Sequence, residues 1–197
     1  KGLKYEAFDD KQDKLVDVLV DEMVNKQAVV GLHQGRFEWG PRALGNRSIL
    51  ADPRGSEMKE VVNTKIKFRE PFRPFAPVIL RDRAAEYFDY PDVQTHEAPR
   101  YMLMVAPFKD EVKHKVEAVN HEGTGRLQAI DRESNQRYYD IVKGFGDATG
   151  VPVVLNTSFN LRGEPIVNTP LEAFNTFRNS DIDLLALGSF LVRKPFV

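Results

Sequence analysis

The sequence predicts an α/β fold, and two observations carry that prediction. Short apolar runs of four to six residues alternate with longer segments of helical periodicity, as in a sheet flanked by helices. The 197 residues are 42% hydrophobic and 29% charged, a composition typical of a globular chain with a sizeable core. Because no segment repeats, we expect one domain over residues 1–197, in which residues 1–8 form a linker.

Helices are expected where apolar residues recur at three- and four-residue spacing. In residues 9–26, leucines and valines recur at a spacing of four, and Asp9 or Asp10 would cap the start. Gly150 and Pro170 stand at positions typical of a helix end and a helix start. The other helices are therefore expected at residues 56–66, 82–90, 135–149 and 170–177.

Strands are expected in the short apolar runs between these helices. Each run is bounded by glycine, proline or a polar cluster, which are typical of turns. Residues 107–119 show neither pattern clearly and predict an irregular or helical excursion. The expected strands are residues 28–33, 48–51, 75–80, 101–105, 127–130, 151–155, 183–187 and 190–192.

Residues 35–47, which we call the arginine loop, contain three arginines, three glycines and the only tryptophan. The pairs Gly40-Pro41 and Gly45-Asn46 favour turns and would place Arg42 at the tip of a bend. The planar guanidinium group suits phosphate or carboxylate. We therefore interpret this segment as an oxyanion-binding loop. The alternative is a surface loop whose arginines pair with nearby acids.

The charge is distributed unevenly along the chain. The formal net charge is −1, but residues 36–83 hold eleven Lys and Arg against six Asp and Glu. This excess indicates one anion-binding site. Basic and aromatic residues alternate in residues 65–75, which is also a pattern of nucleic-acid binding. Nucleic acid is not expected here, because the chain as a whole is not basic.

Several other chemistries are excluded or disfavoured by residue content. The chain has no cysteine, so disulfides and thiol catalysis are excluded, and a cytoplasmic location is expected. No membrane span or signal peptide is visible, and a membrane partner is not expected. The sequence lacks both the P-loop and the HExxH motifs, and no metal site is expected within this chain.

A second polar segment, residues 156–163, follows a hydrophobic strand directly and is expected to form a turn. Ligands of open α/β sheets favour the carboxyl ends of strands. Ser158 can donate to a phosphate oxygen, whereas Asn156 and Asn160 can donate and accept; alternatively these groups bond only their own backbone. With the basic residues they suit phosphoryl or acyl-phosphate chemistry. Those residues are Arg42, Lys65, Lys67, Arg69, Arg73 and Arg126.

Four sequence blocks resemble the C-terminal domain of bacterial carbamoyltransferases, which include enzymes of nodulation-factor, cephamycin and tobramycin biosynthesis. The blocks are GRFEWGPRALGNRSILADPR, REPFRPFAPVIL, GRLQAIDRESN and GVPVVLNTSFNLRGEPIVNTP, and the resemblance runs from about residue 28 to the end. That domain is similar to the YrdC fold, which implies a twisted open mixed sheet flanked by helices. Lys67-Phe68-Arg69 and Ser158-Phe159-Asn160 look like the K-x-R and S-x-N motifs that hold ATP and the acyl group there.

The resemblance implies half of a carbamoyltransferase. Such domains take carbamoyl phosphate and ATP, with Mg²⁺ accompanying the nucleotide, and form carbamoyl-adenylate with release of pyrophosphate. A separate N-terminal domain, similar to the Kae1/ASKHA group, holds a metal and transfers the carbamoyl group to a hydroxyl. That domain is absent from this sequence, which does not begin with methionine. It would be this chain's partner, and a homodimer is the other expected assembly.

The resemblance also implies roles for individual residues. Lys67, Arg73 and Ser158 are expected to be catalytic. Arg42, Lys67, Arg73 and Arg126 would bind the phosphate and carbamoyl oxygens, with Lys65 and Arg69 as second choices. Ser158 and Asn156 would bond to phosphate or adenylate, and Asn160 would order its turn. A nucleic-acid-binding module and a regulatory domain without catalysis are the alternatives.

Overall fold

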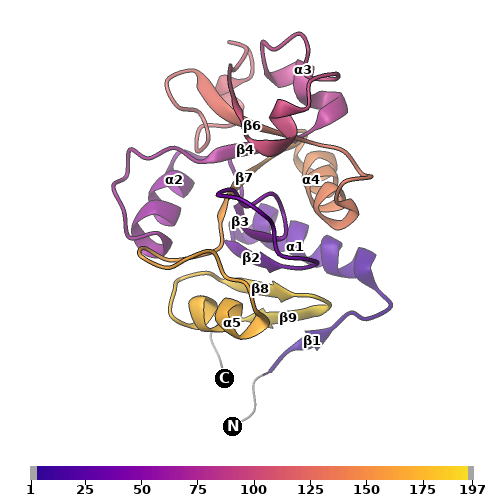
Figure 1. Cartoon of the computed structure of the whole chain (residues 1–197), viewed down its shortest axis with the longest axis vertical. Helices are drawn as coiled ribbons and strands as arrows, with labels where there is room; N and C mark the ends of the chain where they lie inside the picture. The colour runs from indigo at the N-terminus through magenta and orange to yellow at the C-terminus, as the bar shows by residue number, and fades with distance from the viewer. Residues whose placement is uncertain (1–3, 195–197) are drawn as a thin grey trace.

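The computed structural model describes residues 4–194, and within that range nine strands form one open mixed sheet (Figure 1). The strand order is β1-β9-β8-β2-β3-β7-β4-β6-β5. The pairs β2–β8 and β4–β6 are parallel, and the other pairs are antiparallel. The α/β class and the open mixed sheet expected from the sequence are confirmed.

The strands are short and mostly buried. They comprise β1 (Glu6–Ala7), β2 (Val30–His33), β3 (Arg47–Ala51), β4 (Ala76–Leu80), β5 (Met104–Pro107), β6 (Thr124–Ile130), β7 (Val153–Ser158), β8 (Leu184–Leu187) and β9 (Phe190–Arg193).

Helices connect the strands and cover both faces of the sheet. They comprise α1 (Gln12–Lys26), α2 (Glu57–Val61), which continues as a π-helical turn η1 (Val62–Ile66), α3 (Ala84–Tyr87), α4 (Gln136–Thr149) and α5 (Pro170–Arg178). Single 3₁₀ turns occur at η2 (Arg81–Arg83), η3 (Ala98–Tyr101) and η4 (Lys113–Lys115). Among residues 4–194, no helix combines the length and the apolar character that a membrane crossing requires.

Alternation along the strands divides the core into two layers. Ile49 of β3 packs in one layer and its neighbour Leu50 in the other. The first layer also takes side chains from α2, α3 and α5, including Phe177. The second takes Leu19 of α1 and Phe145 of α4. Each such fully buried side chain contributes about 1.5–3 kcal/mol, so both faces anchor the middle strands firmly.

Several predicted boundaries are wrong by a few residues. Helix α1 begins at Gln12, so Asp9 and Asp10 are not its caps; Lys11 holds that position without a side-chain cap bond. Residues 6–7 of the expected linker instead form β1 and pair with β9, whereas residues 1–3 of it lie outside the described residues. Strand β5 begins at residue 104, because residues 98–101 form a 3₁₀ turn.

The predicted ends of the later helices are confirmed. Gly150 caps α4 with a left-handed φ of 74°. Pro170 is at the start of α5, behind a capping box formed by Thr169 and Glu172. Asn135 caps the start of α4 by accepting from the Tyr138 amide. The start and end of α4 and the start of α5 therefore form as their local sequence predicts.

Candidate functional site

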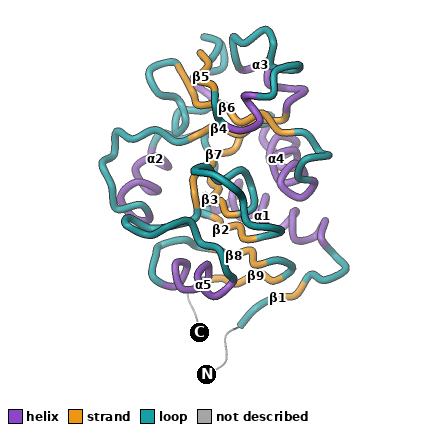
Figure 2. The backbone as a smooth tube through the Cα atoms, in the orientation of Figure 1, coloured by secondary structure: helices purple, strands orange, loops and turns teal. Residues whose placement is uncertain are grey.

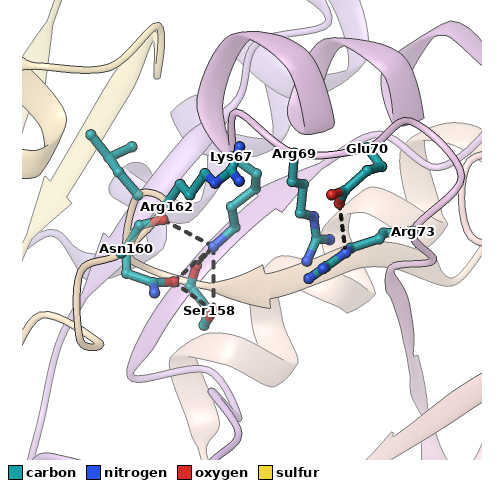
Figure 3. A pocket seen from close by; sticks show the side chains of 9 residues that line it. Lys67, Arg69, Glu70, Arg73, Ser158, Asn160 and Arg162 are labelled. Atoms are coloured by element: carbon teal, nitrogen blue, oxygen red, sulfur yellow. Dashed lines mark hydrogen bonds and ion pairs between the residues drawn. The ribbon is translucent and has the colours of Figure 1, made fainter.

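Lys67 occupies the centre of the site, directly after the π-helical turn η1 (Figure 3). Its ammonium group donates to the Ser158 carbonyl at 2.5 Å, the Asn160 Oδ1 at 2.8 Å and the Asn160 carbonyl at 3.0 Å. Burial, together with the nearby charge of Arg69, lowers the pKa of Lys67 to about 7. The two predicted motifs, K-x-R and S-x-N, therefore lie in direct contact.

Asn63, a residue that sequence reasoning missed, holds the basic segment in shape. It is fully buried, and its amide donates to the carbonyls of Pro71 and Arg73, each at 3.1 Å. Its Oδ1 accepts from Arg69 Nε at 2.7 Å. The sequence signal was a lone asparagine on the apolar side of a helix, since such a residue needs polar partners when buried.

A cavity of about 220 Å³ opens beside Lys67. Figure 3 shows Lys67 grouped with Ser158 and Asn160, with Arg69 and Arg73 on the other side. Arg73 is paired with Glu70 at 2.9 Å, so its charge is partly neutralised. Arg162 also contributes a cation and was not among the predicted site residues. The complete lining is Lys67, Arg69, Glu70, Arg73, Ser158, Asn160, Leu161, Arg162 and Gly163.

A second, smaller cavity of about 110 Å³ shares Arg69 and Ser158 with the first. The two cavities together take six basic side chains and one acidic side chain, Glu70, from their linings. The predicted convergence of distant cations on a shared pocket is therefore observed. The second cavity is lined by Pro41, Arg42, Ala43, Arg69, Pro74, Phe75, Ala76, Met102, Arg126, Asn156, Thr157 and Ser158.

Arg126 and Asn156 reach this cavity from strands rather than from loops. The sequence predicted a strand that begins at residue 127 and a turn from residue 156, but β6 begins at Thr124 and β7 runs to Ser158. Within residues 4–194, Arg126 Nε and Asn156 Oδ1 are the two buried side-chain atoms without a hydrogen-bond partner. Both residues line the second cavity, so one hydrogen-bond donor and one acceptor there are not satisfied by the protein itself.

The arginine loop lies over the middle of the sheet, between β2 and β3 (Figure 2). Glu38 organises it by accepting from the backbone amides of Leu44 and Asn46 at 2.9 Å and of Arg47 at 3.1 Å. Burial raises the pKa of Glu38, although these three amides oppose the rise. A carboxylate inside the loop thus sets the position of its own backbone.

The three arginines of this loop have different roles. Arg42 lines the second cavity, as predicted, whereas Arg36 is exposed and lines neither cavity described above. Arg47 is 4% exposed and donates to the carbonyls of Gln34 at 2.6 Å and Asn168 at 3.1 Å. Oxyanion binding therefore stays a prediction for Arg42, whereas Arg47 is a structural cross-link between two loops.

Lys65 is the one predicted site residue that does not join the others. It is exposed on η1 and lines neither the 220 Å³ nor the 110 Å³ cavity. The π-helical turn places Ile66 in the core and Lys67 toward β7, which directs Lys65 outward. Within residues 4–194, no three His, Asp or Glu side chains gather where they could hold a metal ion.

Comparison with known proteins places this geometry in a family. A family model described as "Carbamoyltransferase C-terminus" matches residues 21–194. The chain belongs to this carbamoyltransferase C-terminal family. The resemblance found in the four sequence blocks is thereby confirmed, and it covers nearly all of the chain.

Curated relatives of this carbamoyltransferase C-terminal domain are much longer proteins. Nodulation protein NolNO of Sinorhizobium fredii is 44% identical over 193 residues, which are 98% of this chain and 27% of that protein. Nodulation protein NolO of Bradyrhizobium diazoefficiens is 45% identical over 185 residues, 93% of this chain and 33% of that protein. The chain therefore spans about a third or less of these relatives.

Solved structures share the fold at low sequence identity. HypF of T. kodakarensis has a TM-score of 0.62 and 16% identity, covering 98% of this chain and 23% of that one. A second HypF structure, described as full-length and in the phosphate- and nucleotide-bound form, has a TM-score of 0.57 and 14% identity. It covers 100% of this chain and 23% of that one. These likenesses confirm the fold.

Proposed function

We propose that this carbamoyltransferase domain binds carbamoyl phosphate and ATP and forms carbamoyl-adenylate. The observation that carries the proposal is the pair of adjoining cavities lined by six cations and one acid. Phosphoryl transfer depends mainly on positioning and on stabilising charge, which such a set provides. The phosphate- and nucleotide-bound state named for the HypF structure is consistent with the same use of this fold.

The balanced reaction consumes one water molecule. Carbamoyl phosphate and water give carbamate and inorganic phosphate as the carbamoyl–phosphate linkage breaks. A carbamate oxygen then attacks the α-phosphorus of ATP, the α–β phosphoanhydride bond breaks, and pyrophosphate leaves. Mg²⁺ carried by the nucleotide would neutralise part of the triphosphate charge. The protein would supply the rest.

Residue roles follow from which cavity each side chain lines. Lys67, Arg69, Arg73 and Arg162 would hold phosphate groups in the larger cavity. The Ser158 hydroxyl donates its one proton to Asn160 Oδ1 at 2.7 Å in this structure and would turn that proton to a phosphate oxygen when the ligand binds. Arg42 and Arg126 would hold the acyl end in the smaller one. Asn160 would order the turn, since its Oδ1 accepts from both Lys67 and the Ser158 hydroxyl.

The test is exchange of labelled pyrophosphate into ATP by the intact full-length protein, in the presence of carbamoyl phosphate. We expect Arg42→Ala, Lys67→Ala and Ser158→Ala each to lower the exchange rate by about 100-fold or more. Lys65→Ala, which changes an exposed cation outside both cavities, should retain it. Unchanged exchange in the first three variants would reject the assignment.

Transfer of the carbamoyl group to a hydroxyl acceptor would take place on an N-terminal domain of the Kae1-like kind. The greater length of NolNO and NolO is consistent with such a partner domain. A nucleic-acid-binding or a regulatory role would instead show binding without exchange. Binding of nucleic acid would also weaken steeply as salt rises.

A further inference from the structure

The side-chain amide of Asn156 has its orientation fixed by a chain of hydrogen bonds that starts at the protein backbone. The Leu44 carbonyl accepts from Gln128 Nε2 at 3.1 Å, so Gln128 turns its Oε1 the other way. That Oε1 and the Ala43 carbonyl accept from Asn156 Nδ2, at 2.7 Å and 3.0 Å. If the Asn156 amide were flipped, its Oδ1 would face the Gln128 Oε1 and the Ala43 carbonyl oxygen, and no hydrogen bond could form. Nδ2 therefore occupies that position, and Oδ1 is the atom left without a donor.

Asn156 Oδ1 is buried and can only accept a hydrogen bond. Asn156 is 1% exposed, and no described residue donates to this oxygen. A buried acceptor without a donor is destabilising, and native proteins keep few of them. The same cavity holds Arg42, Arg69 and Arg126, which suit an anion. A fully ionised phosphate would nevertheless leave Asn156 Oδ1 unsatisfied, because its oxygens have no proton to donate.

Arg126 Nε, the donor of the same cavity that lacks a partner, belongs to β6. Strand β4, with Ala76, lies between β6 and the strand of Asn156. Ala76 pairs with Asn156, and Val78 pairs with Gln128. Continuing this register by two residues sets Arg126 beside Ala76 on the same face of the sheet. With strands about 4.8 Å apart, Arg126 and Asn156 stand on strands about 10 Å apart, with Ala76 at the intervening position of β4.

We propose that Asn156 and Arg126 select the carbamoyl group by its two different edges. The carbamoyl NH₂ donates to Asn156 Oδ1, and the carbamoyl carbonyl oxygen accepts from Arg126 Nε–H. This inference rests on the proposed function and adds the acyl specificity of the site. The cavity holds about 110 Å³, well below the roughly 300 Å³ at which drug-sized ligand pockets begin, so a small planar group fits it better than a nucleoside.

Two stable phosphonates test this pairing by calorimetry on the intact full-length protein. Phosphonoacetamide keeps the amide, whereas acetonylphosphonate replaces its NH₂ with a methyl group of nearly the same size. We expect phosphonoacetamide to bind at least tenfold more tightly, because the methyl ketone leaves the buried Oδ1 without a donor. In Asn156→Ala the ratio of the two dissociation constants should fall to within about threefold of one.

Tyr138→Phe is the matched control. Its hydroxyl donates to Gln128 Oε1 at 3.3 Å, so it belongs to the same network but does not line the cavity. The variant should keep the wild-type ratio. The comparison of the two phosphonates on the wild-type protein tests the inference even if Asn156→Ala does not fold. Equal binding of the two phosphonates to the wild type would overturn the inference.

Three further outcomes separate this inference from the proposed function. If AMP binding falls more than phosphonoacetamide binding in Asn156→Ala, the oxygen serves the nucleoside and the inference is wrong. If carbamoyl phosphate supports pyrophosphate exchange but the phosphonates bind equally, the function stands and only the acyl selection fails. If neither exchange nor phosphonate binding occurs, both are wrong.

Discussion

The protonation state of the buried Lys67 depends on two opposing effects, its oxygen contacts and its burial. Lys67 has four oxygen atoms of Ser158 and Asn160 within 3.3 Å of its ammonium nitrogen, which favours the charged form. Burial and Arg69 favour the neutral form and hold its pKa near 7. The same residue therefore braces the turn after β7 and provides a charge that can change near neutral pH.

This lowered pKa makes a prediction about stability. The folded-state pKa lies below the unfolded value of about 10.4, so between these values the unfolded chain binds more protons. The Lys67 contribution to the free energy of unfolding should therefore rise with pH above about 7, by at most about 1.4 kcal/mol per pH unit. Urea unfolding at pH 7, 8 and 9 measures it.

The comparison that isolates Lys67 is the difference between wild type and Lys67→Met across that pH series. We expect this difference to widen as pH rises, because the methionine variant lacks the titrating group. The exposed Lys65→Met should follow the wild type. A difference that is constant between pH 7 and 9 would show that Lys67 keeps its ordinary pKa.

At the scale of elements, the arginine loop is shaped by a helix on which it rests. Gly45 has a φ of +114°, and a Cβ placed there would lie 2.2 Å from Tyr138 Cδ1 of α4. Only glycine fits at position 45 without strain, because it tolerates the positive φ and leaves room for the Tyr138 ring. The conformation of the loop around Gly45 is therefore restricted by packing against the Tyr138 ring of α4.

Gly45→Ala should lower the free energy of unfolding by roughly 3 kcal/mol, since backbone strain and overpacking both act. It should also displace Arg42 and lower pyrophosphate exchange. Gly40→Ala is the control, because Gly40 has a φ of +115° but no atom within 4 Å of the added Cβ. Chemical denaturation of both variants measures the difference, and equal losses would contradict the role given to Tyr138.

The sequence predicted most elements, because periodicity and turn residues are local signals. It did not predict that β6 begins at Thr124 or that β7 continues through Asn156, Thr157 and Ser158. Polar residues extend these strands because neighbouring strands pair with them: Ser48 pairs with Ser158, and Val105 with Arg126. Such pairing depends on distant segments and leaves no local pattern.

The same limit explains which site residues were found. Clusters of Arg and Lys revealed Lys67, Arg69, Arg42 and Arg126. Lys65 fails because the sequence did not show that residues 62–66 form a π-helical turn, which directs Lys65 outward. Asn63 and Arg162 were missed, since a lone polar residue says little until its partners are known. Their roles become clear only from the folded arrangement.

At the scale of the whole molecule, the site is assembled from segments far apart in the chain. Arg42, Lys67, Arg126 and Ser158 come from the arginine loop, the end of η1, β6 and β7. The net charge of −1 shows that this basic pocket is balanced by acidic groups elsewhere. An anion that bridges these segments should therefore stabilise the whole fold rather than one loop.

Inorganic pyrophosphate at about 100 times its dissociation constant should stabilise the domain by about 2.7 kcal/mol, or roughly 5–10 °C in melting temperature. Thermal denaturation of the intact protein measures this shift. Arg69→Ala should lose most of it at the same pyrophosphate concentration, because Arg69 lines both cavities. Lys65→Ala should keep it, and equal shifts in the two variants would contradict the site.

The pairing of β1 with β9 has a consequence for how this domain is joined to others. Glu6 lies opposite Leu191, and Ala7 opposite Phe190, so the two ends of the described chain leave from one edge of the sheet (Figure 1). The strands β7, β4 and β6, which contribute residues to the two cavities, are several strands away from that edge. A linker attached at either end of the described residues would therefore leave the sheet on the side away from the pocket, and its movement would not displace the strands that contribute to the cavities.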